Sequence, residues 1–183
     1  CGQRKKVGEK VHWLSERSDN FLSDFQGRDL ISELEIALNA DGKFMALRAD
    51  NISNIGAFSS SFTPLSKGAE IAVGPYLFGS ARVRARGVFS HSPPTNPYRS
   101  AGRPEVIYAL ERLIDIAADK LGFDKIELRR QNLIPDSAFP YDNKLGMLYD
   151  CGEMQTCLTK AQKLADWEGY QERLRQSKDR GLL

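Results

Sequence analysis

The feature that most constrains the fold is a pair of strand-like segments joined by a turn. In the first segment, residues 29–38, alternation places most of the apolar side chains on one face: Leu30, Leu34, Ile36 and Leu38. The next four residues, Asn39-Ala40-Asp41-Gly42, are typical of a turn, and Gly42 can adopt a positive φ. Residues 43–55 then return as a second apolar-rich strand. The pattern predicts a long antiparallel hairpin.

The second half of the chain has a helical pattern. After Pro104, which suits the start of a helix, apolar residues follow at helical spacing up to Gly122: Val106, Leu110, Leu113, Ile114, Ala117 and Leu121. Because strands come first and helices follow, we expect an α+β fold. In this fold an antiparallel sheet with a long hairpin in the first half is packed by helices from the second half.

Two acidic pairs predict the starts of further helices. Asp124 with Glu127 resembles a capping box for a short helix through Leu133. Asp150 with Glu153 can open another helix. That last helix is expected to turn its apolar residues inward: Met154, Cys157, Leu158, Ala161, Leu164 and Ala165.

Three stretches of the first half are less regular. Residues 11–14 form a short strand candidate, and residues 56–79 are either a loop or contain a short helix around residues 67–72. In residues 81–89, strict alternation puts Arg82, Arg84 and Arg86 on one face of a strand. This face is either the solvated outside of the sheet or a cationic stripe for a phosphate or a partner subunit.

Composition excludes several functional classes. Lys and Arg number 26 against 24 Asp and Glu, so the net charge of +2 gives no general attraction to nucleic acid. No apolar run approaches the roughly 20 residues that span a bilayer. Three cysteines and two separated histidines give neither a disulfide framework nor a metal-ligand spacing. We expect reduced cysteines, a cytoplasmic protein and no metal ligated by its side chains.

Residues 91–105 are the segment that could carry chemistry. Three prolines restrict the approach to Tyr98, and small residues after Arg99 would let a ligand come close to the backbone. The helix expected near Pro104 directs free N–H groups back toward this loop, and Arg99 and Arg103 add fixed positive charge. These features describe either an anion-facing loop or a proline-rich connection with surface arginines.

Several segments, in this order, resemble landmarks of the large, molybdopterin-binding subunit of the molybdenum hydroxylases. This family includes xanthine dehydrogenase, aldehyde oxidase and carbon monoxide dehydrogenase. The segments are Trp13-Leu14-Ser15-Glu16-Arg17-Ser18-Asp19-Asn20-Phe21, Asn54-Ile55-Gly56-Ala57-Phe58, Pro97-Tyr98-Arg99-Ser100-Ala101-Gly102-Arg103-Pro104-Glu105, Glu127-Leu128-Arg129-Arg130-Gln131-Asn132-Leu133-Ile134, Phe139-Pro140-Tyr141 and Tyr149-Asp150-Cys151-Gly152.

The resemblance implies an oxidoreductase that binds molybdopterin, in bacteria usually as the cytosine dinucleotide, and inserts oxygen from water into a small-molecule substrate. It implies iron–sulfur and flavin subunits as electron-accepting partners, besides the rest of the large subunit. Arg99 is then the catalytic candidate, expected to contact the oxo ligand or the substrate. Tyr98, Ser100 and Ala101 are expected to lie beside the cofactor.

Two positions depart from the family pattern. Carbon monoxide dehydrogenases with a copper–sulfur bridge carry Cys where Ser100 stands, and xanthine and aldehyde oxidoreductases usually carry an aromatic residue where Ala101 stands. We therefore expect a carbon-monoxide-dehydrogenase-like relative of undefined substrate, with aldehydes and aromatic heterocycles still open.

Residues 1–183 are expected to be one internal fragment of the molybdopterin-binding region. Residues 1–97 would be mainly strands and loops, and residues 98–183 the cofactor-facing loop and helices. The family's glycine-rich pterin loop is expected before Cys1 and its catalytic glutamate beyond Leu183, so the piece alone should be inactive. The alternative is a structural or subunit-interface module without a direct catalytic role.

Overall fold

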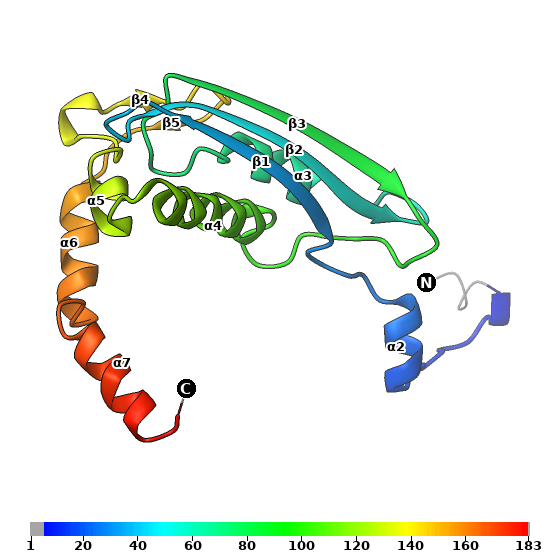
Figure 1. The fold of residues 1–183 in the computed structure, drawn as a ribbon. Helices are drawn as coiled ribbons and strands as arrows, with labels where there is room; N and C mark the ends of the chain where they lie inside the picture. The colour runs from blue at the N-terminus through cyan, green and yellow to red at the C-terminus, as the bar shows by residue number, and fades with distance from the viewer. Residues whose placement is uncertain (1–5, 183) are drawn as a thin grey trace.

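The computed structural model describes residues 6–182, so the expectation placed on Cys1 lies outside the described residues. Figure 1 shows a curved sheet lying over helix α4, with helical arms leading away from it at both ends of the chain. In chain order, the elements are α2 (Arg17–Ser23), β1 (Leu30–Leu38), β2 (Phe44–Gly56), α3 (Thr63–Glu70), β3 (Ser80–Phe89), α4 (Arg103–Leu121), α5 (Lys125–Arg130), a 3-10 turn (Asp136–Ala138), β4 (Tyr141–Asp142), β5 (Leu148–Tyr149), α6 (Met154–Leu164) and α7 (Tyr170–Asp179).

The predicted hairpin is confirmed. Strands β1 and β2 pair antiparallel, with Leu34 opposite Ala49. The side-chain oxygen of Asn39 accepts hydrogen bonds from the amides of Asp41 and Lys43, at 3.1 and 2.8 Å, and so closes the turn. Gly42 has a φ of 79° there, the left-handed region that favours glycine.

The third strand corrects the expected antiparallel sheet. Strand β3 pairs with β2 in parallel, so the sheet, with the order β1-β2-β3, is mixed. A parallel neighbour needs a long crossover, and residues 57–79 provide one that contains α3. The expected short helix therefore exists, beginning earlier than predicted, at Thr63. No strand forms over residues 11–14, whose side chains are exposed.

The core lies between the sheet and α4, which ends at Gly122 as predicted. Residues Leu110 and Ile114 of α4 are fully buried against the inner face of the sheet. Each buried aliphatic side chain of this size contributes roughly 1.5–3 kcal/mol. The other buried members of this cluster come from β2, the crossover, α4, α5 and the segment after α5: Phe44, Leu47, Val73, Tyr76, Phe78, Ala118, Leu128 and Leu133.

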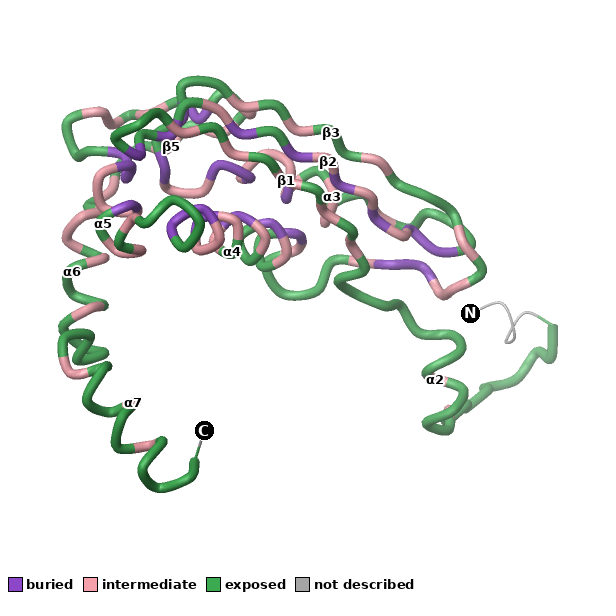
Figure 2. The backbone as a smooth tube through the Cα atoms, in the orientation of Figure 1, coloured by how far each residue is buried: buried purple, intermediate pink, exposed green. Residues whose placement is uncertain are grey.

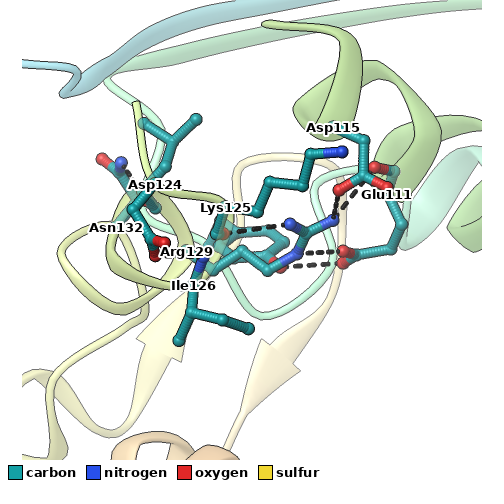
Figure 3. A network of polar contacts seen from close by, with 9 residues as sticks. Glu111, Asp115, Asp124, Lys125, Ile126, Arg129 and Asn132 are labelled. Carbon is teal, nitrogen blue, oxygen red and sulfur yellow. Dashed lines mark hydrogen bonds and ion pairs between the residues drawn. The ribbon is translucent and has the colours of Figure 1, made fainter. Parts of the chain in front are cut away.

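Helix α5 is fixed by its polar residues (Figure 3). Asp124 caps it as predicted, accepting hydrogen bonds from two backbone amides, at 2.8 and 2.9 Å. The side chain of Glu127 accepts from Arg130 instead of completing the expected capping box, and the helix ends at Arg130 and not at Leu133. Arg129 donates to the carboxylates of Glu111 and Asp115 on α4, at 2.7 and 2.8 Å. The buried side chain of Asn132 accepts from the amide of Phe44 at 2.9 Å, and its amide group donates to backbone carbonyls at 2.8 and 2.9 Å. Packing of the hairpin turn against α5 thus depends on polar contacts.

Helix α6 was expected to be a core helix, and this expectation is wrong. Met154 and Leu158 are half-buried against the core, but Cys157, Ala161 and Ala165 are exposed and Leu164 is 89% exposed. Figure 2 shows the reason: α6 and α7 lead away from the body as a mostly exposed arm. An apolar stripe buries side chains only where another element faces it.

The cap expected for α6 is also different. The side chain of Asp150 accepts from the amide of Cys151 at 2.9 Å, and the N-cap residue Glu153 makes no side-chain cap hydrogen bond. A separate helix, α7, follows α6. Among residues 6–182, none of the helices has both the length and the apolar character needed to cross a bilayer.

Candidate functional site

The approach to the candidate loop is held against the end of β2. The side chain of Asn54 donates to Asp29 and Ser92, both at 2.8 Å, and accepts from the amide of Gly56 at 2.9 Å. Gly56 has a φ of 78°, and a Cβ there would lie 2.4 Å from the backbone of Pro94. This close approach fixes the proline-rich segment on the sheet, so the loop that follows starts from a defined position.

The backbone of the loop is left-handed over four consecutive residues. The φ values are 25° at Arg99, 65° at Ser100, 27° at Ala101 and 89° at Gly102. Non-glycine residues in this region cost on the order of 1–3 kcal/mol each, and such strain concentrates at functional sites. A Cβ on Gly102 would lie 1.8 Å from the carbonyl oxygen of Pro64, so the loop also rests directly on α3.

Hydrogen-bond donors of the loop are left without protein partners. Within residues 6–182, the backbone amides of Arg99, Ser100 and Gly102 donate to no other group, and neither does the guanidinium of Arg99. Helix α4 begins at the next residue and adds the positive end of its dipole. The loop therefore presents donors and positive charge without a matching acceptor, an arrangement that suits an anionic ligand.

Arg28, which precedes β1, reaches across to this loop. Its Nη2 donates to the carbonyl oxygens of Tyr98 and Arg99, at 3.2 and 2.8 Å, and its Nη1 forms an ion pair with Glu105 at 3.1 Å. The guanidinium carbon also lies 5.5 Å from the centre of the Tyr98 ring. One side chain thus contacts both sides of the left-handed run.

The structure places the four residues predicted for the site side by side at one end of α4. Tyr98, Arg99 and Ser100 are exposed, and Ala101 is half-buried. Arg103, which was expected to add charge to the loop, is exposed and donates to the carbonyl of Ser100 at 3.4 Å. In the part of the chain that the structure describes, no three histidine, cysteine or acidic side chains are grouped to hold a metal ion.

Sequence reasoning did not find Arg28 or the anchoring role of Asn54. Seventy residues separate Arg28 from Tyr98, and no periodicity connects two irregular segments across that interval. Asn54 was noted only as part of a resemblance. A glycine at the end of the apolar strand segment, Gly56, is the local sequence signal for a close backbone contact.

The arginines of β3 share one face of the strand, as the alternation predicted, and this is the outer face of the sheet. Arg86 pairs with Asp50 on β2 at 2.8 Å, and Arg84 lies 3.8 Å from the same carboxylate. Arg84 and Arg86 thus have an acidic partner, Asp50, within the sheet. None of the three arginines contacts the candidate loop through a hydrogen bond or ion pair.

Comparison with known proteins shows the family of the chain. A family described as "Molybdopterin cofactor-binding domain" matches residues 4–133. The chain is 32% identical over 169 residues to the carbon monoxide dehydrogenase large chain of Hydrogenophaga pseudoflava, covering 90% of this chain and 21% of that one. The chain thus spans about a fifth of that relative's length.

Solved structures show the same fold. Quinoline 2-oxidoreductase from Pseudomonas putida 86 superposes with a TM-score of 0.90 at 26% identity, covering 99% of this chain and 24% of that one. A Cu,Mo-CO dehydrogenase in its carbon-monoxide-reduced state gives 0.85 at 29% identity, covering 100% and 24%. The chain therefore belongs to the molybdopterin cofactor-binding domain family that is found in the large subunits of molybdenum hydroxylases.

Proposed function

We propose that this chain supplies one wall of the molybdenum site in a carbon-monoxide-dehydrogenase-like oxidoreductase, through the loop Tyr98–Ala101. Arg99 is the catalytic residue, in contact with the metal's oxo ligand or with substrate, and Tyr98, Ser100 and Ala101 lie beside the cofactor. The observation that carries this proposal is the left-handed run in which, within residues 6–182, the amides of Arg99, Ser100 and Gly102 and the guanidinium of Arg99 have no protein acceptor.

The residues present fit such a group. A molybdopterin cofactor is anionic, through its phosphate and its oxo-metal centre, and these groups offer acceptors to the surrounding protein. Within residues 6–182, the loop offers donors to match these acceptors, namely three amides and one guanidinium without protein partners. Ser100 and Gly102 are small enough to let the cofactor approach the backbone closely. A protein acceptor such as Glu105 is already occupied by Arg28 and does not compete for these donors.

When bound, the cofactor supplies the two-electron oxidation in which oxygen from water enters the substrate. The part of this chain is electrostatic. The guanidinium of Arg99 supplies a fixed positive charge that stabilises negative charge beside it. A rigid loop holds that charge in place before the reaction, so little reorganisation is needed during it.

At the level of the whole enzyme, the proposal includes the remainder of the large subunit, iron–sulfur and flavin subunits, and a cytosine dinucleotide form of the cofactor. The 183-residue chain alone is expected to bind no molybdenum and to show no turnover. Elemental analysis of the purified chain tests this directly, and stoichiometric molybdenum would contradict it.

The role of Arg99 is tested in the polypeptide encoded by the complete reading frame that contains this chain. Carbon monoxide and quinoline serve as test substrates, with an artificial dye as electron acceptor. We expect Arg99→Ala to lower kcat by about 10²–10³-fold at unchanged molybdenum content and melting temperature. Arg82→Ala, which removes an exposed arginine from the sheet, is the matched control. Wild-type turnover in Arg99→Ala would leave only the structural or interface role.

A further inference from the structure

We propose that Arg28 is the positioning residue that holds the Tyr98–Gly102 loop in its left-handed conformation and so fixes the direction of Arg99. The inference rests on the proposed function of the loop for its meaning in the reaction. The contacts that carry it are independent of any cofactor. They join a segment before β1 to a loop that follows β3.

The first step is the geometry of one guanidinium. The Nη2 of Arg28 donates to two consecutive carbonyls, those of Tyr98 and Arg99, at 3.2 and 2.8 Å. Its Nη1 reaches Glu105, in the first turn of α4, at 3.1 Å. Only a planar fork with several donors can satisfy acceptors on both sides of the run together.

The second step is the weakness of the loop's own bond at the start of the run. There the amide of Ala101 donates to the carbonyl of Tyr98 at 3.4 Å, which exceeds the usual range for N–H···O bonds. At the far end, the amide of Arg103 donates to the carbonyl of Ser100 at 3.0 Å, so that end is held by the backbone itself. The shorter contacts at the start of the run come from Arg28, and charge-assisted donation to a carbonyl is roughly twice as strong as neutral donation.

The third step is that Arg28 is itself held. The backbone on its N-terminal side pairs with the segment leading to the loop: the amide of Gln26 donates to Pro94 and that of Asn96 to Gln26, both at 2.9 Å. The side chains of Arg28 and Glu105 are 32% and 12% exposed, which limits screening of their ion pair. Because its backbone is held in place and its ion-pair partner is shielded from solvent, Arg28 can hold the loop in one conformation.

The donors of Arg28 point at protein acceptors, which distinguishes it from Arg99. A residue whose Nη atoms are occupied in this way does not contact the reacting atoms, and its effect on turnover must pass through the loop. Removing it should therefore loosen the loop first and lower activity as a consequence.

Trypsin offers a direct readout in the complete polypeptide, because the loop contains one cleavable bond. Cleavage after Arg99 requires the loop to open, whereas Arg103 is protected by the proline that follows it. The variants are Arg28→Met, Arg28→Lys and, as matched control, Arg112→Met. Arg112 lines the same groove between β1 and α4, and within the described residues it makes no hydrogen bond to the loop.

We expect Arg28→Met to raise the cleavage rate after Arg99 by at least about tenfold, Arg28→Lys to give an intermediate rate, and the control to match the wild type. Cleavage after Arg129, which lies in a packed segment, should stay unchanged. Equal rates after Arg99 in Arg28→Met and the wild type would overturn the proposal. So would a parallel rise at both sites, because Arg28 would then be a general stability residue.

Turnover and molybdenum content measured on the same samples separate the two proposals. A selective opening of the loop with a lower kcat, at unchanged molybdenum, supports both. If Arg28→Met selectively opens the loop but both Arg28→Met and Arg99→Ala keep wild-type turnover, the positioning role of Arg28 is supported and the proposed function is overturned. If Arg28→Met loses turnover without faster cleavage after Arg99, only the positioning role of Arg28 is overturned.

Discussion

Two glycines with similar backbone angles allow the strain of the candidate loop to be measured. Gly102 and Gly122 flank α4, with φ values of 89° and 75°. An alanine at either position bears the left-handed penalty, about 1–2 kcal/mol. At Gly102 its Cβ also lies 1.8 Å from the carbonyl oxygen of Pro64, whereas at Gly122 nothing lies within 4 Å.

The steric term decides the difference between the two substitutions. The Cβ and the Pro64 oxygen must separate by about 1.2 Å, from 1.8 Å to the 3.0 Å below which real Cβ contacts essentially never fall. Because both atoms belong to the backbone of packed segments, we expect an overpacking cost of about 1–3 kcal/mol. Gly102→Ala should therefore cost about 2–5 kcal/mol and Gly122→Ala about 1–2 kcal/mol.

Urea unfolding followed by circular dichroism measures both variants against the wild type. The change in unfolded-state entropy on replacing glycine with alanine is common to the two and cancels in their difference. An excess of at least about 1 kcal/mol for Gly102→Ala is the expected result. Equal costs at the two positions would show that the loop does not rest on α3, and the close approach described above would be refuted.

Two further predictions concern the polar network beneath α5. Arg129→Met should lower the free energy of unfolding in urea by about 2–3 kcal/mol, which is less than the 3–5 kcal/mol of a fully buried pair because Glu111 and Asp115 are about one-third exposed. The control, Arg130→Met, should lower it by about 0–1 kcal/mol. Similar losses in the two variants would contradict this prediction. Burial and then the charge of Glu111 raise the pKa of Tyr76, so the stability from its protonated form is complete below about pH 10 and is lost as the pH rises further. Tyr76→Phe should accordingly lose less stability than the wild type between pH 8 and pH 11, and identical slopes in the two proteins would argue against the raised pKa.

The sequence predicted the elements whose stability is local. The turn at Asn39–Gly42 and the helix that ends at Gly122 depend on residues close together in the chain, and both are present. The direction of β3 could not be predicted, because a strand pattern carries no information about the partner across a crossover. The exposure of Leu164 could not be predicted either, because an apolar stripe does not show whether another element covers it.

The same distinction, between features that the sequence predicts and features that it does not, applies to the candidate site. Tyr98, Arg99, Ser100 and Ala101 are adjacent in the sequence, so resemblance and loop chemistry could locate them together. The contact from Arg28 forms only when the segment before β1 lies beside the start of α4, and the sequence pattern also carries no sign of the left-handed backbone of this run. Alternation and helical spacing describe single elements, and neither predicts a contact between two irregular segments.

The open edges of the mixed sheet have a consequence for concentrated solutions. Within residues 6–182 no strand pairs with the outer edge of β1 or of β3, and their charges differ: β1 carries only Glu33 and Glu35, whereas β3 carries only arginines. The edge of β1 in one copy is complementary in charge to the edge of β3 in the next. Repeating such a contact gives a closed ring only if the rotation between successive copies permits it. If the chain by itself pairs through these edges, light scattering should grow with protein concentration and fall as salt is added; scattering that depends on neither would show that the edge charges keep copies apart.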